Sequence, residues 1–315
     1  MKHPNSLISE PVVMTAYQMP HPIQTIQDAR RLTNIQFRVL GRYDKLNRAG
    51  RPCSKLTLGN LAGTASAVID HADFLPCHRN VDHGDIILIN GELLDVADRF
   101  VIRLEDFYTP GADRAKPTAL LPKDWVLPNF LSQLRTVVRH WSHLAHPGLK
   151  HLLAETFLDA NNALGFLNAP GSLRFHHAYQ GGLLDHTADM LRQLECRPWQ
   201  HWRPIEKEIA TVLIILHDIG KTVTLVGQGT SERGRHQPHE MAALELLAAP
   251  LARLESSDSQ IANRIRGYFK PRNWYPRQPD PIYHIVASLD RASANISAPL
   301  PQGVPGNGIH QGGQQ

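Results

Sequence analysis

Short apolar segments alternate with turn residues in the first third of the chain. β-branched and aromatic residues dominate five such segments, and turn signals such as NRAGRP and VDHG separate them. The segments are IQFRVLGRY, SKLTLGNL, TASAVID, DIILINGELLDV and RFVIRLEDF. Strands of this number and length are typical of a small closed barrel, and we expect an OB-fold-like barrel over residues 34–110. A five-stranded sheet packed on another layer is the alternative that the pattern leaves open.

A helical period replaces the strand pattern beyond residues 111–128, a proline-bearing stretch that we interpret as a linker. Apolar residues then recur at spacings of three and four throughout residues 129–296. Pro250 is expected to kink or stop the helix in which it lies. The predicted fold class is therefore α+β with two domains, a small N-terminal β-barrel followed by an all-α domain. The predicted helices cover 130–141, 149–158, 182–195, 205–217, 238–254, 259–269 and 281–294.

The two ends of the chain lack both patterns. Residues 1–33 are polar and carry prolines, so we expect an irregular lead-in. Residues 297–315 are rich in Gly, Pro and Gln, a composition that predicts a disordered tail. No signal peptide is apparent, and the longest apolar run, 212–216, is too short to span a bilayer. We therefore expect no membrane insertion.

The composition of the chain bears on its binding partners and on the cellular compartment in which it works. The net charge of +4 is compatible with a polyanionic partner but does not demand one. The three cysteines form no CxxC pair, which argues against a disulfide framework and against a thiolate zinc site, and favours the cytoplasm. The chain also contains 18 histidines, an unusually large number, and several of them lie close together.

Histidines and aspartates stand on successive predicted helices, several of them where an apolar run ends. Each alone fits a structural role, as a satisfied core histidine, a helix cap or a buried hydrogen-bonding carboxylate. Together they favour a metal site, because burying several ionisable groups is costly without a compensating ion. Imidazole plus carboxylate suits Mn²⁺, Fe²⁺, Co²⁺, Ni²⁺ or Mg²⁺. In chain order the residues are His186, His217, Asp218, either His236 or His239, and Asp290.

This H…HD…D order, with an apolar helix running into LHDIGK, resembles the HD superfamily of metal-dependent phosphohydrolases over residues 176–294. The string HHAYQGGLLDHT is more specific. It is similar to the HHAYxGGLLEHT segment of YhaM-type 3′→5′ exoribonucleases, and a related segment occurs in the HD-type domain of some conjugative relaxases. YhaM-type proteins also place an OB-fold before the HD domain. SKLTLGNLAGTASAVID is similar to their OB segment, although Asn60 stands where an Asp is typical.

The resemblance implies a set of metal ligands: His186, His217, Asp218, His239 and Asp290. The family also has a His-His pair in the helix before the last Asp, which supplies another ligand for a second metal. The corresponding stretch here, IANRIRGYFKPRNWYP, contains no histidine, and this puts a two-metal site in doubt. His284 lies on the last predicted helix, but its spacing from Asp290 places it on a different face.

Three further roles follow if the site is catalytic. Asp218 is placed to orient the attacking water. Lys221 is a candidate for pairing with a phosphate, with a solvated lysine at a helix end as the alternative. His177, beside His176, is a candidate for contacting the substrate or donating a proton to the leaving oxygen, and a supporting role behind the ligands is the alternative for one of the two.

Nucleic-acid contacts are predicted in two places. The loop FKPRNWYPRQPDP interleaves cations with aromatic residues, a mixture that suits phosphate pairing and base stacking. A proline-stiffened loop whose aromatics pack on the core is the alternative. In the first strand, alternation places Phe37 and Tyr43 on one face, where one or both belong to the core. The candidates are Lys270, Arg272, Trp274, Tyr275 and Arg277 in the loop, and Phe37, Arg38, Arg42, Tyr43 and Lys45 in the strand.

The sequence thus predicts a metal-dependent phosphodiester hydrolase acting on single-stranded RNA or DNA, with 3′→5′ exonuclease activity and Mn²⁺ as the preferred metal. Two alternatives stay open. The first is an HD phosphohydrolase that acts on nucleotides; the predicted barrel counts against it, because an enzyme for small molecules does not need such a domain. A nucleic-acid-binding protein of a mobile element, with weak or no catalysis, is favoured by the missing His-His pair and opposed by the H…HD…D set. Homo-oligomerisation is compatible with each of these.

Overall fold

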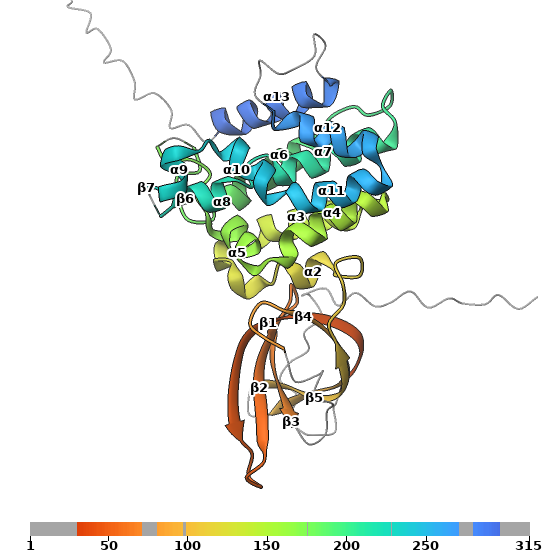
Figure 1. Cartoon of the computed structure of the whole chain (residues 1–315), viewed down its shortest axis with the longest axis vertical. Coiled ribbons are helices and arrows are strands. Elements are labelled where there is room, and N and C mark those ends of the chain that lie inside the picture. The colour runs from red at the N-terminus through yellow and green to blue at the C-terminus, as the bar shows by residue number, and fades with distance from the viewer. Residues whose placement is uncertain are drawn as a thin grey trace, which may run out of the picture.

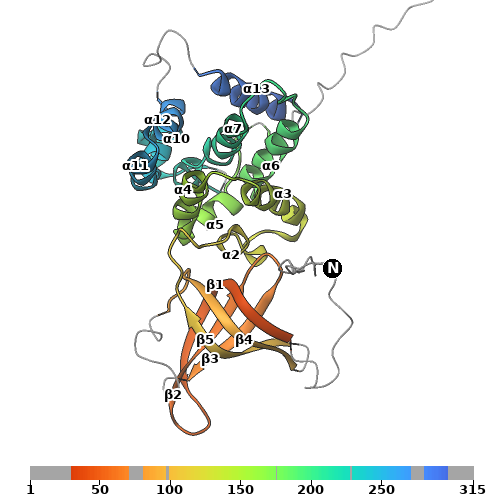
Figure 2. The ribbon, with the colours of Figure 1, turned by 90° about the vertical axis from the view of Figure 1, so that its right-hand side faces the viewer.

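Two parts of different secondary structure lie end to end along the long axis (Figures 1 and 2). The computed structural model describes residues 30–70, 81–96, 99–174, 176–227, 229–270 and 280–296. A closed five-stranded barrel precedes a helical part, which confirms the predicted fold class. The barrel strands are β1 (Arg30–Leu46), β2 (Pro52–Gly59), β3 (Thr64–Asp70), β4 (Ile86–Val96) and β5 (Arg99–Tyr108).

The barrel closes in the order β1-β2-β3-β5-β4, with β1 pairing to both β2 and β4. All pairs are antiparallel except the parallel pair of β3 and β5. The length of β1 allows it to serve two neighbours, since its first half pairs with β4 and its second half with β2. Alternating residues of the strands point inward and form a separate apolar core, which includes Val39, Leu58, Ile69, Ile87 and Ile102.

A β-bulge in β1 overturns one prediction about its faces. Strict alternation predicts that Phe37 and Tyr43 share a face, but the register with β2 shifts between Val39 and Gly41. Phe37 is buried in the barrel core, whereas the side chain of Tyr43 is 67% exposed and lies opposite exposed Lys55. An extra residue in one strand reverses the side-chain alternation beyond it.

Residues 111–128 connect the two parts and contain α2 (Pro117–Leu120) and the 3₁₀ turns η3 (Lys123–Trp125) and η4 (Pro128–Phe130). The prolines that favour a linker in the sequence begin two of these elements, a position where the missing N–H costs nothing. Leu120 and Leu121 are fully buried in the core of the helical part. Gln36 of β1 accepts from the Lys116 N–H and donates to the Arg114 carbonyl, so this segment is bonded to the barrel.

The helical part brings distant segments of the chain together. α13 packs against both α6 and α7, and α10 packs against α8. The longer helices are α3 (Leu131–Ser142), α4 (Pro147–Leu158), α5 (Ala160–Asn168), α6 (Gly182–Glu195), α7 (Pro204–Leu216), α10 (His239–Leu246), α11 (Ala248–Ser257), α12 (Ser259–Tyr268) and α13 (Pro281–Ile296). The short elements are α8 (Lys221–Thr224), β6 (Leu225–Val226), β7 (Gly229–Thr230) and α9 (Glu232–His236).

The helix predicted over 238–254 is two helices that meet at Leu247. Pro250 lies in the first turn of α11 and does not stop a helix as predicted. The first turn tolerates proline because its N–H groups have no partner within the helix. The break therefore falls before the proline.

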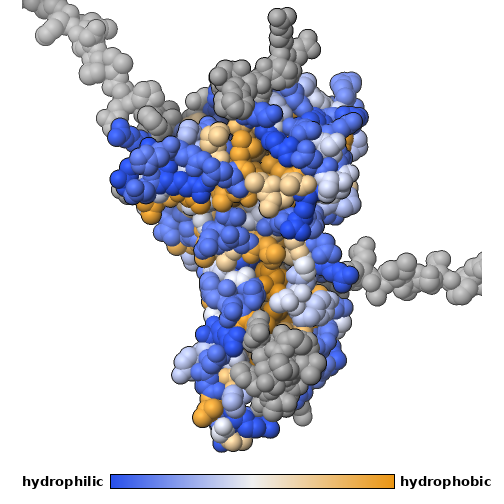
Figure 3. All heavy atoms as spheres, viewed as in Figure 1, coloured by the Kyte–Doolittle hydropathy of each residue, from blue (hydrophilic) through white to orange (hydrophobic). Residues whose placement is uncertain are grey.

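On the face shown in Figure 3, apolar residues gather along the middle of the helical part and at its junction with the barrel. The helical core extends to this junction, where it includes Ile86 at the start of β4. Among the helices of the described ranges, none combines the length and hydrophobicity that crossing a membrane requires.

Candidate metal centre

Three helical elements converge on one cluster of histidine and aspartate side chains. His186 lies in the second turn of α6, and His217 and Asp218 follow directly on the last turn of α7. Asp290 comes from α13, so residues far apart in the chain meet here. The side chains of His186, His217 and Asp218 are at most 6% exposed, and that of Asp290 is 44% exposed. Three of the four side chains are therefore buried, and Asp290 is the one that solvent reaches.

The donor atoms of the cluster face one another. His186 Nε2 lies 3.2 Å from His217 Nε2 and 3.1 Å from Asp290 Oδ1. His217 Nε2 lies 3.2 Å from Asp218 Oδ2. One donor atom from each of His186, His217 and Asp218 falls within 4.8 Å of the other two. Such a spacing suits three ligands of one ion.

Hydrogen bonds behind the two imidazoles orient their rings, and one of them assigns the tautomer of His217. His217 Nδ1 donates to the Ile214 carbonyl at 2.8 Å, because a carbonyl only accepts. His186 Nδ1 lies 3.0 Å from the hydroxyl of Ser293, which is fully buried. When His217 is neutral, its Nε2 therefore carries the lone pair, and this atom lies 3.2 Å from His186 Nε2, so that one cation between the two rings could bind both. Metal-bound histidines are typically held by such partners. The residues therefore fit a divalent metal.

The charges of the cluster stabilise one another. Burial raises the pKa of the Asp218 carboxyl, but His217 and Lys221 outweigh burial and hold that pKa well below its usual range. Burial likewise opposes charge on His217, but the adjacent Asp218 raises the pKa of the imidazole above its ordinary value. Asp218 is therefore a carboxylate at neutral pH, the form in which it binds a cation.

His239, the first residue of α10, reaches Asp218 from a further direction, with Nε2 at 3.1 Å from Oδ1. Gly220 permits this approach. A Cβ on Gly220 would lie 1.8 Å from the carbonyl oxygen of His239, so no larger residue fits without moving α10. On the opposite oxygen of Asp218, Lys221 Nζ lies at 2.5 Å and also donates to the Gly171 carbonyl at 2.6 Å.

His177 lies beside the cluster, with its ring centroid 5.3 Å from that of His186. It is buried, and its φ of +54° is rare for a residue with a Cβ. Its Nδ1 lies 3.0 Å from the Tyr179 hydroxyl, which donates to Asp185 at 2.6 Å. Gln133 donates to the other oxygen of Asp185 at 3.0 Å. The hydrogen bond from His177 leads the interactions that hold the pKa of Asp185 well below its usual range.

The remaining candidate histidines differ in their positions. The His176 ring centroid is 5.9 Å from that of His186, and burial is the first cause of its lowered pKa. His236 is exposed at the end of α9, and His284 is exposed on α13. Within the part of the chain that the structure describes, neither contacts the cluster. Of the two histidines before α10, the structure brings His239 to the cluster and leaves His236 away from it.

The barrel candidates separate into buried and exposed residues. Arg38 is fully buried, so the prediction that it contacts a single strand is wrong. Its guanidinium donates to the Phe157 carbonyl at the end of α4 at 2.6 Å, and its Cζ lies 4.9 Å from the centroid of the Trp125 ring. Arg38 therefore joins the barrel to the helical part. Burial lowers its pKa to about 10.

Arg42 is partly covered and bonded within the barrel, to Asp44 at 2.9 Å and to the Val81 carbonyl at 2.8 Å. Tyr43 and Lys45 are exposed on the outside of β1. Lys270 is exposed at the end of α12. The other loop candidates lie outside the described residues: Arg272, Trp274, Tyr275 and Arg277.

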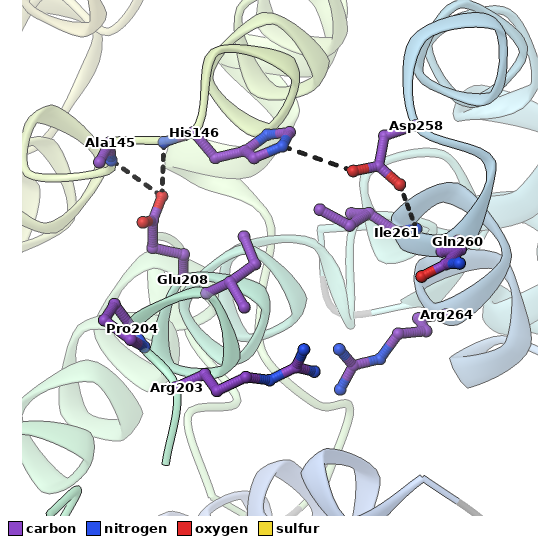
Figure 4. Close-up of a pocket in the computed structure, with 10 residues that line it drawn as sticks. Ala145, His146, Arg203, Pro204, Glu208, Asp258, Gln260, Ile261 and Arg264 are labelled. Atoms are coloured by element: carbon purple, nitrogen blue, oxygen red, sulfur yellow. Dashed lines mark hydrogen bonds and ion pairs between the residues drawn. The ribbon is translucent and has the colours of Figure 1, made fainter.

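A cavity of about 620 Å³ is lined by none of the cluster residues (Figure 4). Several of its polar side chains are bonded to other parts of the protein. Glu208 accepts from the N–H groups of Ala145 and His146 at 2.8 Å each. Arg203 and Arg264 both bind Glu206. These bonds connect residues of different helices and loops, and the lining of the cavity shares no residue with the metal cluster.

Four residues of the site escaped the sequence-based prediction: Gln133, Tyr179, Asp185 and Ser293. Ser293 follows Asp290 by three residues on the same helix, a spacing that places both side chains on one face and could have indicated it. Tyr179 and Asp185 lie within the motif string, but their mutual contact depends on the turn between them. Gln133 comes from α3, and no spacing in the sequence connects it to the site.

No protein-family model matches this chain. The chain is similar to the 3′-5′ exoribonuclease YhaM of Shouchella clausii (strain KSM-K16), with 24% identity over 194 residues. The alignment covers 56% of this chain and 54% of that protein, so the chain spans about half the length of the curated relative it matches. This similarity supports a YhaM-like family, and the observed barrel agrees with it.

Proposed function

We propose that this protein is a metal-dependent phosphodiester hydrolase of the HD type that shortens single-stranded nucleic acid from the 3′ end. The observation that carries the proposal is the convergence of His186, His217, Asp218 and Asp290 from separate helices with both imidazole Nε2 atoms facing inward. The similarity to an exoribonuclease supports a nucleic-acid substrate. The proposed fifth ligand is His239, which lies against the second oxygen of Asp218.

These residues would hold a divalent cation, with Mn²⁺ as the preferred candidate, which would supply a Lewis acid for the phosphoryl oxygens and would lower the pKa of a bound water. Asp218 is deprotonated and orients the attacking water. Lys221 uses two of its three ammonium protons on Asp218 and Gly171, and the third pairs with the substrate phosphate.

His177 is proposed to contact the leaving oxygen. The chain Tyr179–Asp185–Gln133 holds the Nδ1 side of its ring, so that the ring keeps one orientation beside His186. Tyr179 and Asp185 are therefore positioning residues for His177. Tyr179→Phe should lower kcat while leaving KM and metal affinity near the wild-type values, whereas a merely structural role would lower the melting temperature without this split.

The function is tested with single strands labelled at the 3′ or the 5′ end and incubated with Mn²⁺. We expect immediate release of the 3′ label as a mononucleotide and progressive shortening of 5′-labelled strands. Asp218→Ala should abolish both, while Asp189→Ala, a carboxylate of α6 outside the cluster, should not. Degradation that persists in Asp218→Ala, or cleavage at internal sites, would show that the assignment is wrong. Parallel RNA and DNA strands identify the preferred sugar.

A further inference from the structure

A second cavity, of about 400 Å³, adjoins the metal cluster through Lys221. The side chain of Lys221 lines the cavity, and its Nζ also binds Asp218 and the Gly171 carbonyl. The volume lies in the range of sites for small organic ligands. The cavity is lined by Ser172, Leu173, Arg174, Lys221 and Leu225.

The walls of this cavity are mainly apolar and come from two segments. Leu173 follows α5 and is 38% exposed, and Leu225 begins β6 and is half-buried. The hydrogen bond from Lys221 Nζ to the Gly171 carbonyl connects the segment that contains Leu173 to α8, the helix that precedes Leu225. Lys221 therefore connects both walls of the cavity to Asp218 of the metal cluster.

The polar groups at the cavity carry positive charge or are already bonded. The Ser172 hydroxyl donates to the His176 carbonyl at 2.6 Å. Arg174 is exposed and makes no ion pair with any residue in the described ranges. Two cations, Arg174 and Lys221, thus flank an apolar surface next to the cluster. A ligand that complements this surface has a flat apolar body and a negative charge at its edge.

We propose that this cavity binds the nucleoside adjoining the scissile phosphate, with the base held between Leu173 and Leu225 and the flanking phosphates paired with Arg174 and Lys221. This proposal rests on the proposed function. The leucines contact the faces of a base, which all four bases share, and the bonded hydroxyl of Ser172 does not read base edges. The site therefore requires a base but accepts any of the four.

The test uses strands that differ only in an abasic residue on the 3′ or the 5′ side of the cleaved bond. For the wild type, one of these two substitutions should lower kcat/KM about tenfold, a loss typical of removing apolar contact with one buried group. The double variant Leu173→Ala/Leu225→Ala should cleave the abasic and the complete strand equally. Val226→Ala removes an exposed apolar side chain that does not line the cavity and should retain the preference.

Binding separates the failure of this proposal from the failure of the proposed function. A strand carrying 2-aminopurine at the sensitive position, or at each side of the terminal phosphate if no strand is cleaved, is titrated with full-length protein. Its fluorescence should change on binding to the wild type and to Val226→Ala, but not to the double variant. Equal fluorescence changes in all three proteins, or a base preference retained in the double variant, would overturn the nucleoside site.

Discussion

Ser293→Ala perturbs the metal site without touching a proposed ligand. The Ser293 hydroxyl lies 3.0 Å from His186 Nδ1, and both side chains are buried. Alanine removes this partner of Nδ1. The imidazole then loses the contact that holds its ring with Nε2 facing His217. A histidine that is less firmly oriented binds a metal more weakly.

Two estimates of the effect agree. An unpartnered buried donor or acceptor costs about 1–3 kcal/mol. Loss of a partner behind a metal-bound histidine typically weakens metal binding about 10- to 100-fold, which corresponds to about 1.4–2.7 kcal/mol. We therefore expect the Mn²⁺ dissociation constant of Ser293→Ala to rise by one to two orders of magnitude.

Isothermal titration calorimetry of metal-free protein with Mn²⁺ measures this change. Ser142→Ala is the matched control, because the hydroxyl of Ser142 bonds only to the Val138 carbonyl of its own helix. Its affinity should equal that of the wild type. The reasoning is refuted if Ser293→Ala binds Mn²⁺ as tightly as the wild type while His186→Ala does not.

Three more substitutions test other parts of the structure. Gly220→Ala forces α10 away, because the new Cβ would lie 1.8 Å from the His239 carbonyl oxygen. Thermal unfolding should show a loss of stability of about 1–3 kcal/mol, and calorimetry should show weaker Mn²⁺ binding. An unchanged affinity for Mn²⁺ would exclude His239 as a ligand. Arg38→Met removes the hydrogen bond to the end of α4 and should lower the free energy of unfolding in urea by about 2 kcal/mol. The affinity for single-stranded nucleic acid should not change. Weaker strand binding at equal stability would instead make Arg38 a nucleic-acid contact. Burial lowers the pKa of His140 from its ordinary 6.5 to about 4, so its stabilising contribution is complete above pH 6.5 and is lost as the pH falls toward 4. In urea titrations His140→Gln should flatten the stability profile across this interval, and an identical slope in both proteins would show that His140 is not the group responsible.

The barrel was predictable because each strand alternates over a short length and ends at a turn signal. Alternation alone could not predict the bulge after Val39, because the bulge depends on how β1 divides its pairing between β2 and β4. The burial of Arg38 could not be predicted from the sequence either, since its position on the outer face of β1 becomes covered only when α4 and Trp125 pack over it. Both differences arise from tertiary contacts that local patterns do not contain.

The candidate site shows the same division. The order of histidines and aspartates along the chain identified the residues that meet. Apolar helices pack together in one core, so the polar residues at their ends lie close to one another. The spacing of the residues left the choice between His236 and His239 open, and the resemblance pointed to His239. The turn at Gln237 and Pro238, which ends α9 and starts α10, places His239 beside Asp218. The support of His177 by Tyr179, Asp185 and Gln133 depends on side chains whose spacing in the sequence carries no period.

Anomalous diffraction at the manganese edge from crystals grown with Mn²⁺ tests the central claim most directly. The account predicts an anomalous peak within bonding distance of His186 Nε2, His217 Nε2 and a carboxylate oxygen of Asp218, and its disappearance in Asp218→Ala. Mn²⁺ density at other positions with none at this cluster would contradict the account.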